Sequence, residues 1–87
     1  MQNERPAAEV RLGRVKAAIW RNEGTSGVWF NVTVSRLYND GDGPGDWKQS
    51  HSFGRDDLPL VAKVCDLAHT RIFELQTAER EQARVAS

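Results

Sequence analysis

Polar and apolar residues alternate strictly between Gly27 and Tyr38, which is the pattern of a β-strand with two chemically different faces. The apolar face carries Val28, Phe30, Val32 and Val34. The other face carries Trp29, Asn31, Thr33 and Ser35. An indole among hydrogen-bonding groups with no acidic residue fits a ligand-binding face, and it fits equally well a half-buried antiparallel strand with one incidental tryptophan.

A second alternating stretch precedes this one. Its apolar positions are Val10, Leu12, Val15, Ala17 and Ile19, and their phase slips at Gly13–Arg14. A glycine inside a strand pattern most often marks a bulge or a sharp bend, so the slip predicts one long, bent strand. After the slip the other face carries Arg14, Lys16, Ala18 and Trp20. The small polar residues from 22 to 27 predict a hairpin that merges this face with that of the next strand.

The segment from Trp47 to Phe53 alternates as well and predicts a further strand. Its phase predicts Trp47 and Phe53 on the apolar side, with Lys48, Ser50 and Ser52 outside. The loop from 39 to 46 is rich in Asp and Gly, but it lacks the closing Glu and the flanking helices of an EF-hand. We therefore expect a hairpin loop there and no calcium site.

A long helix is predicted from Asp56 to Gln76. Asp56 and Asp57 can cap its free N–H groups, and Pro59 falls in the first turn, where its missing N–H costs nothing. Apolar residues spaced three and four apart form one stripe of Leu58, Val61, Cys65, Ala68, Ile72 and Leu75, which Leu60, Val64 and Leu67 widen. The sequence therefore predicts an α+β fold, a curved antiparallel sheet of three to four strands followed by one long C-terminal helix packed on one face.

The chain divides into a loose arm over residues 1–9, one sheet-and-helix domain over 10–76 and a fraying tail over 77–87. A domain this small buries only part of its apolar surface. The helix, about 30 Å long over its predicted span, is longer than a short sheet is wide. We therefore expect a homodimer whose interface includes the helix, with Phe73 near the partner.

The whole chain carries 12 basic and 12 acidic residues and has no net charge, which argues against a generic polyanion binder. Between Val10 and Arg55, however, the sequence has seven basic residues and only four acidic ones, so the predicted sheet is locally basic. No apolar run reaches the length of a membrane span, and the polar start resembles no signal peptide. With one cysteine and hence no internal disulfide, the sequence predicts a cytoplasmic protein that does not contact a membrane.

Residues for catalysis or metal binding are sparse. Cys65 and His69 are four apart on the predicted helix and offer two ligands, whereas zinc requires three or four. On the apolar stripe Cys65 is expected to be buried, protonated and inert. We expect no enzymatic activity, no cofactor, no metal site and no small-molecule substrate.

The remaining hypothesis is single-stranded nucleic-acid binding across the merged strand face. Unpaired bases stack on aromatic rings while Lys and Arg follow the phosphates. The candidate residues are Arg14, Lys16, Trp20, Trp29, Asn31, Thr33 and Lys48. The alternative is a homodimeric protein-interaction module that uses the same Trp-bearing face.

Three segments resemble the positive-cofactor-four family of transcriptional coactivators: residues 12–16, LGRVK, residues 32–40, VTVSRLYND, and residues 52–58, SFGRDDL. The resemblance covers roughly Val10 to Leu75. It implies a curved antiparallel sheet with one helix, homodimers formed through the helices and sheet edges, and binding of single-stranded DNA with little sequence preference. A transcription, replication or repair accessory role follows from it. By position it adds Tyr38 as an aromatic contact and supports Arg14 and Lys16 as basic contacts.

Overall fold

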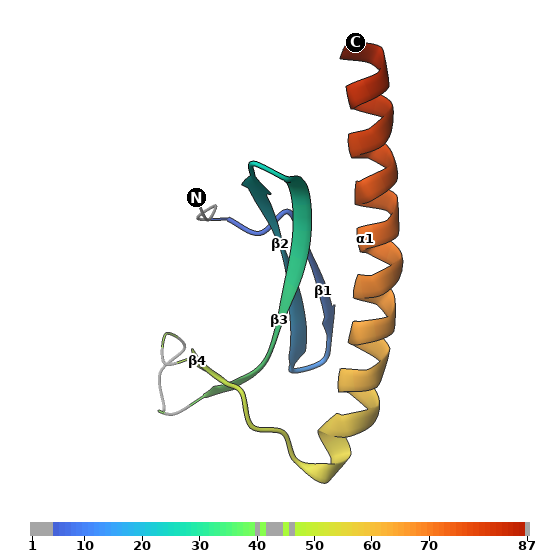
Figure 1. Ribbon diagram of the computed structural model, residues 1–87. Coiled ribbons are helices and arrows are strands. Elements are labelled where there is room, and N and C mark those ends of the chain that lie inside the picture. The colour runs from blue at the N-terminus through green and yellow to red at the C-terminus, as the bar shows by residue number, and fades with distance from the viewer. Residues whose placement is uncertain (1–4, 40, 42–44, 46, 87) are drawn as a thin grey trace.

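The computed structural model describes residues 5–39, 41, 45 and 47–86 of the 87-residue chain. Four antiparallel strands are followed by a short 3-10 turn and one long helix (Figure 1). The elements are β1 (Ala8–Leu12), β2 (Val15–Gly24), β3 (Gly27–Asn39), β4 (Trp47–Ser50), the turn Arg55–Asp57 and α1 (Leu58–Ala86). The sheet order is β1-β2-β3-β4, and α1 covers one face, so the predicted α+β fold class is confirmed.

The prediction of one long, bent first strand is wrong, because this segment forms two strands, β1 and β2. β1 and β2 are antiparallel, and Leu12 pairs directly with Val15 across a two-residue turn. Gly13 takes a φ of 59°, a left-handed conformation that glycine adopts without steric cost, and so the chain reverses there. Antiparallel partners share a face, so the apolar alternation looks the same for a bent strand and for a tight hairpin.

The predicted hairpin between the next two strands is confirmed. β2 and β3 pair from Val15↔Arg36 to Gly24↔Gly27, which leaves only Thr25 and Ser26 in the loop. β4 pairs with the last four residues of β3, Arg36 to Asn39. Most of the Asp- and Gly-rich loop lies outside the described residues, so the expected hairpin loop there stays a prediction.

The core lies between the sheet and α1. Val15, Ala17 and Ile19 of β2 are fully buried, and they pack with Val64 and Ala68 of the helix. Partly buried apolar residues surround them: Ala8, Val10, Leu12, Phe30, Val32, Val34, Phe53, Leu60, Val61, Ile72 and Leu75. Burying a Val or Ile side chain completely contributes about 1.5–3 kcal/mol, so this small centre accounts for much of the stability.

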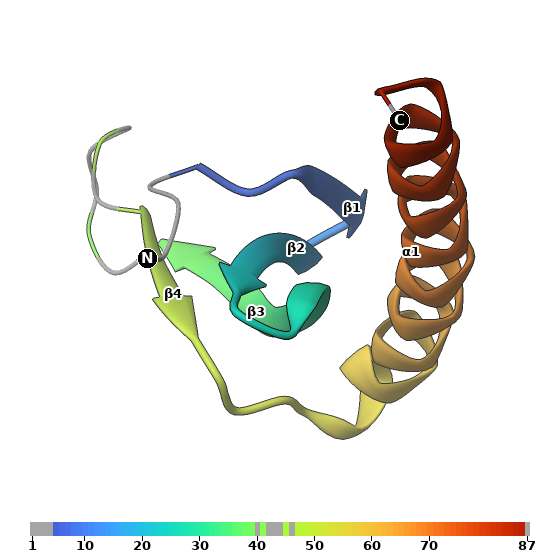
Figure 2. The same ribbon diagram turned by 45° about the horizontal axis from the view of Figure 1, so that its top comes forward.

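Cys65 is not in this core, contrary to prediction; it is exposed. The helix packs mainly against β1 and β2 and less against β3, and Figure 2 shows β1 as the strand nearest to it. This placement turns Val64 into the sheet and leaves Cys65, one position further around the helix, on the β3 side. The widened stripe in the sequence allowed either rotation.

The helix begins beside a buried carboxylate. Asp57 accepts a hydrogen bond from the Gly54 backbone N–H at 2.9 Å, and its side chain is only 10% exposed. The guanidinium of Arg36 lies 3.7 Å from the Asp57 carboxylate, and that of Arg14 lies 3.9 Å from it. Asp57 therefore connects the helix start with β3 and with the β1–β2 turn.

The helix continues to Ala86, ten residues past the predicted end at Gln76. Arg21 of β2 forms an ion pair with Glu79, which holds this extension to the sheet. The hydrogen bond from Arg21 lowers the pKa of the Glu79 carboxyl, and the same contact raises the pKa of Arg21. At 1.5 Å per residue α1 is about 43 Å long, and it extends beyond the upper end of the sheet (Figure 1).

None of the described helical residues form a segment long and apolar enough to cross a membrane.

Candidate nucleic-acid interface

The side of the sheet away from α1, which we call the outer face, brings together five of the eight predicted site residues. These are Lys16, Trp20, Trp29, Asn31 and Thr33. On β2 and β3 the register opposes Lys16 to Ser35, Ala18 to Thr33, Trp20 to Asn31 and Asn22 to Trp29. Directly opposed residues of an antiparallel pair point to the same side, so all of them share this face.

The outer face is curved. The lower part of β3 and all of β4 turn away from α1, so that the sheet bends around the face that the helix leaves open (Figure 1). The two small residues of this face, Ala18 and Ser35, are only 5% and 4% exposed. They therefore form its floor, and the longer side chains around them form the contact surface.

Hydrogen bonds fix the polar groups of the outer face. The indole Nε1–H of Trp20 donates to Thr33 Oγ1 at 2.9 Å. The side-chain amide of Asn22 donates to Asn31 Oδ1 at 2.9 Å. Each bond links the two strands across the same face, which holds the indole and the amide groups in defined positions. The amide –NH₂ group of Asn31 is not used in this contact and can donate to a ligand.

Trp29 is 49% exposed, and its ring lies over the backbone of Gly24. A Cβ atom at Gly24 would lie 3.0 Å from Trp29 Cζ3 and 3.2 Å from Cη2, which is tighter than nine in ten real Cβ contacts, so the ring would have to shift by a few tenths of an ångström. A glycine at position 24 is therefore what lets the indole settle there. Because half of the ring remains exposed, it can receive a planar group.

Trp47 belongs to the outer face, contrary to the prediction that placed it with Phe53. Its partner in the register is Asn39, which has the same alternation phase as Asn31 and Thr33, and Trp47 is 57% exposed. β4 ends at Ser50, so the alternation does not continue to Phe53, which packs against the core. The sequence indicates this position of Trp47 only indirectly: the alternation of β3 continues to Asn39, and Trp47 can be placed once it is known to pair with Asn39.

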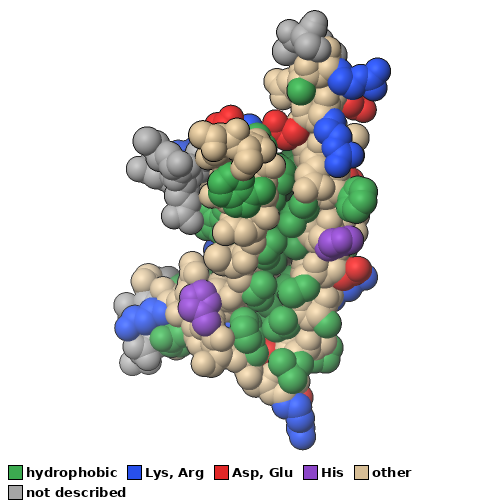
Figure 3. Space-filling model, in the orientation of Figure 1, with side chains coloured by type: hydrophobic (Ala, Val, Ile, Leu, Met, Phe, Trp, Pro, Cys, Tyr) green, Lys and Arg blue, Asp and Glu red, His purple; other side chains and the backbone are tan. Residues whose placement is uncertain are grey.

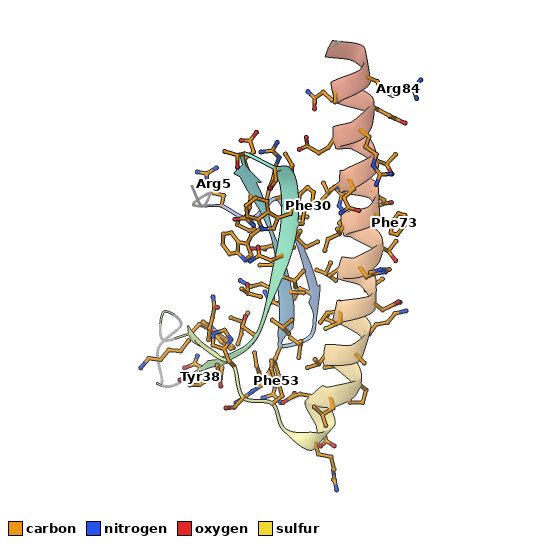
Figure 4. All side chains as sticks on the ribbon, in the orientation of Figure 1. Arg5, Phe30, Tyr38, Phe53, Phe73 and Arg84 are labelled. Carbon is orange, nitrogen blue, oxygen red and sulfur yellow. The ribbon has the colours of Figure 1, made fainter. Side chains whose placement is uncertain are left out.

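Arg14, Tyr38 and Lys48 do not lie on the outer face. Lys48 pairs with Tyr38, which shares the alternation phase of Arg36 and not that of Thr33. Lys48 therefore points away from the outer face, and its predicted position on the outside of the strand is wrong. The Arg36 guanidinium lies over the Tyr38 ring, 5.7 Å from its centroid, while Arg14 pairs with Asp57. These residues gather at the β4 end of the molecule, where Figure 4 shows Tyr38 far from α1.

The charge of the outer face is modestly positive. Arg11 and Lys16 are opposed on β1 and β2. Lys16 Nζ lies 3.9 Å from a carboxylate oxygen of Glu9, and Arg11 donates to the carbonyl of Gly13 at 3.1 Å. Arg11 and Asn22 are outer-face residues that the sequence reasoning left out of the site, and the strand register identifies both.

Within one chain, the described residues contain no group of three or more His, Cys, Asp or Glu side chains placed to hold a metal ion.

Comparison with known proteins gives no match: no protein-family model, no curated protein and no solved structure is significantly similar to this chain.

Proposed function

We propose that this protein binds single-stranded nucleic acid, with DNA the first candidate, across the outer face, and that it acts as a homodimer without enzymatic activity. The observation that carries the proposal is the exposed Trp29, beside the hydrogen-bonded Trp20 and the Asn22–Asn31 pair on one curved sheet face. A role as a transcription, replication or repair accessory factor would suit this activity, as the family resemblance implies, and the single cysteine suits a cytoplasmic location.

The chemistry of the face suits unpaired bases. Every base has a π-face, so stacking on an indole tolerates any sequence, whereas the side-chain amide of Asn31 can pair with base edges. Arg11 and Lys16 lie on the same face and can follow the phosphates. With zero net charge over the chain, only these local cations contribute, so we expect moderate affinity and a small number of phosphate contacts.

Arg36, Tyr38 and Lys48 offer a second set of contacts at the β4 end. An arginine held over a tyrosine ring presents a flat cation to a phosphate or a base, although this set lies in the other alternation phase. A strand of nucleic acid that follows the bend of the sheet would pass from the tryptophans toward this end.

The homodimer is supported by apolar surface that the single chain leaves open. A compact domain of this size has a radius of gyration of about 12 Å, whereas the described chain has 15.7 Å. β4 pairs only with residues 36–39 of β3, so along the rest of β3 the edge opposite β2 has no partner strand in the described sheet. Beside this edge, Val28 and Phe30 line a hollow against the extended end of α1, and Phe73 is 62% exposed. A second copy would cover this side.

A titration of labelled oligo-dT at about 50 mM and about 200 mM salt tests the proposal. We expect the oligonucleotide to bind with an affinity that falls as the salt concentration rises. Binding should also quench the Trp fluorescence of the protein, since stacked bases quench indoles. A matching oligo-U titration separates DNA from RNA. Light scattering in the same buffers measures the mass, and a monomer of 9.8 kDa at micromolar concentration would exclude the homodimer.

The alternative, a protein-interaction module, makes the opposite prediction for the same titration. Trp and Asn side chains also suit a protein partner, and the Glu9 carboxylate beside Lys16 would repel a phosphate. No binding to any single strand at low salt would favour this alternative.

A further inference from the structure

Two exposed tryptophans lie at opposite ends of the outer face. Trp29, near the hairpin end of β3, is 49% exposed, and Trp47, which pairs with Asn39, is 57% exposed. Trp29 and Asn39 are ten residues apart on β3. At about 3.3 Å per residue this separation is about 33 Å along the strand, and the bend of the sheet shortens the direct path. A single base therefore contacts one of these indoles and not both.

The surface between the two indoles carries neutral and basic side chains. Lys16 pairs with Ser35 between them, and Arg11 is opposite Lys16 on β1. The carboxylate of Glu9 on β1 lies 3.9 Å from Lys16 Nζ, so it limits the positive charge without removing it. The other positions of this phase on β3 and β4 are neutral: Asn31, Thr33, Leu37, Asn39 and Gln49. A ligand that contacts both indoles passes the two cations.

The shape of this surface suits an unpaired strand. The sheet bends around the outer face, so a ligand that reaches both ends must bend with it (Figure 1). A single strand bends easily, whereas duplex DNA has a persistence length of about 50 nm and resists such a bend. The bases of a duplex are also stacked on both sides, and hence they offer no open face to an indole.

The homodimer proposed above leaves the outer face open. Figure 3 shows the hydrophobic seam between β3 and α1, and the open edge of β3 that we assign to the second copy lies along this seam. The outer face lies on the side of the sheet away from α1, so the second copy does not cover it. Each copy therefore presents a complete outer face.

We propose that the outer face holds one single strand at two separate stacking points, Trp29 at one end and Trp47 at the other, and that it selects strands long enough to reach both. This two-point contact rests on the nucleic-acid binding proposed above and adds Trp47 to it. Phosphates between the two stacked bases pass Lys16 and Arg11, whose positive charge attracts them. Once one base has stacked, the second stacks within the same complex, so its effective concentration is high.

The separation of the two stacking points sets the length of the strand. Nucleotides of a stacked strand are about 3.4 Å apart, so about ten of them cover the distance, and fewer suffice where the backbone is extended. Strands of about three nucleotides reach only one end. We therefore expect selection by length and not by sequence, since stacking tolerates every base.

A length series of labelled oligo-dT tests the two stacking points. Affinity is measured by fluorescence anisotropy, at one low salt concentration, for strands of about 3, 6, 9 and 12 nucleotides. We expect a steep rise in affinity up to the length that reaches both indoles and a slight rise beyond it, because further nucleotides then add only alternative positions. Affinity that grows merely in proportion to length, or that is complete for the shortest strand, would overturn the two-point contact.

Trp47→Ala should remove this steep rise. The affinity of the longest strands should fall roughly tenfold, the loss of one stacked base, toward that of the shorter strands. Trp47→Phe keeps an aromatic ring and should restore most of the affinity, which a change of the fold alone would not explain. Trp47 is outside the core, so both variants should fold, and a thermal melt checks this. Leu58→Ala is the matched control, because Leu58 is 54% exposed on α1, away from the outer face.

Three results would overturn Trp47 as a second stacking point: affinity of Trp47→Ala within about twofold of wild type at every length, an equal loss at every length, or no recovery in Trp47→Phe. Binding of oligo-dT would stand in each case, so the proposed function would survive. Absence of oligo-dT binding at every length would overturn both.

Discussion

Removing the indole of Trp29 should separate binding from folding. Trp29→Ala deletes a side chain that is 49% exposed on the outer face, and its ring rests on the Gly24 backbone and not on the core. Stacking of one base on an aromatic ring contributes about 1–3 kcal/mol. Half of the ring is already covered, so one base at most can stack on it, and the lower half of this range applies. We expect oligo-dT affinity to fall roughly tenfold.

The assay is fluorescence anisotropy of labelled oligo-dT, with a thermal melt of each variant to show that it is folded. Trp29→Phe keeps an aromatic face and should retain most of the affinity. Leu58→Ala is the matched control, because Leu58 is 54% exposed at the start of α1, away from the outer face, and its truncation should leave binding unchanged. Affinity of Trp29→Ala within about twofold of wild type would refute the stacking role.

The position of the indole can be tested without removing it. Gly24→Ala would place a Cβ atom 3.0 Å from the Trp29 ring, so the ring must move. The backbone at Gly24 lies outside the left-handed region, and hence alanine should be tolerated there. We expect a shift in Trp emission and weaker oligo-dT binding, with the sheet intact by circular dichroism. Unchanged emission and affinity would show that the placement of the ring is irrelevant to binding.

Three further predictions concern charge. Lys16→Ala should lower oligo-dT affinity modestly and reduce the slope of log affinity against log salt by about 0.7, the share of one phosphate contact on a single strand; an unchanged slope would remove Lys16 from the interface. Asp57→Ala should lower the free energy of unfolding in urea by about 1–3 kcal/mol, since it removes the acceptor of the Gly54 N–H and the partner of Arg36. A urea midpoint equal to wild type would contradict this. Because folding lowers the pKa of Glu79, its ion pair stabilises the protein above the usual carboxyl pKa and is lost as pH falls through the lower, folded value. Thermal melts of wild type and Glu79→Gln should therefore differ at about pH 7, and the difference should shrink as the pH falls below the usual carboxyl pKa; a constant difference would exclude the linkage.

The rotation of the helix and the pairing of the short strand were decided by tertiary structure. The apolar stripe of α1 is wide enough to point either Val64 or Cys65 at the sheet, and only packing against β1 and β2 selects Val64. Likewise, the alternation from Trp47 onward predicts Trp47 on the apolar side, whereas its pairing with Asn39 places it on the outer face. A shift by one residue moves every side chain of a strand to the opposite face, so Trp47 and Lys48 could not be placed before the partner strand was known.

What the sequence by itself determined is the pair of faces on β2 and β3. The two-residue period of a strand separates Val15, Ala17 and Ile19 from Lys16 and Trp20 whatever the partners are, and the short hairpin then fixes the neighbouring strand. The fold class followed from the same periods. The tertiary structure decided what periods cannot encode: the reversal at Gly13, where antiparallel partners share a face, and the long-range contact of Arg21 with Glu79, which depends on where the helix lies.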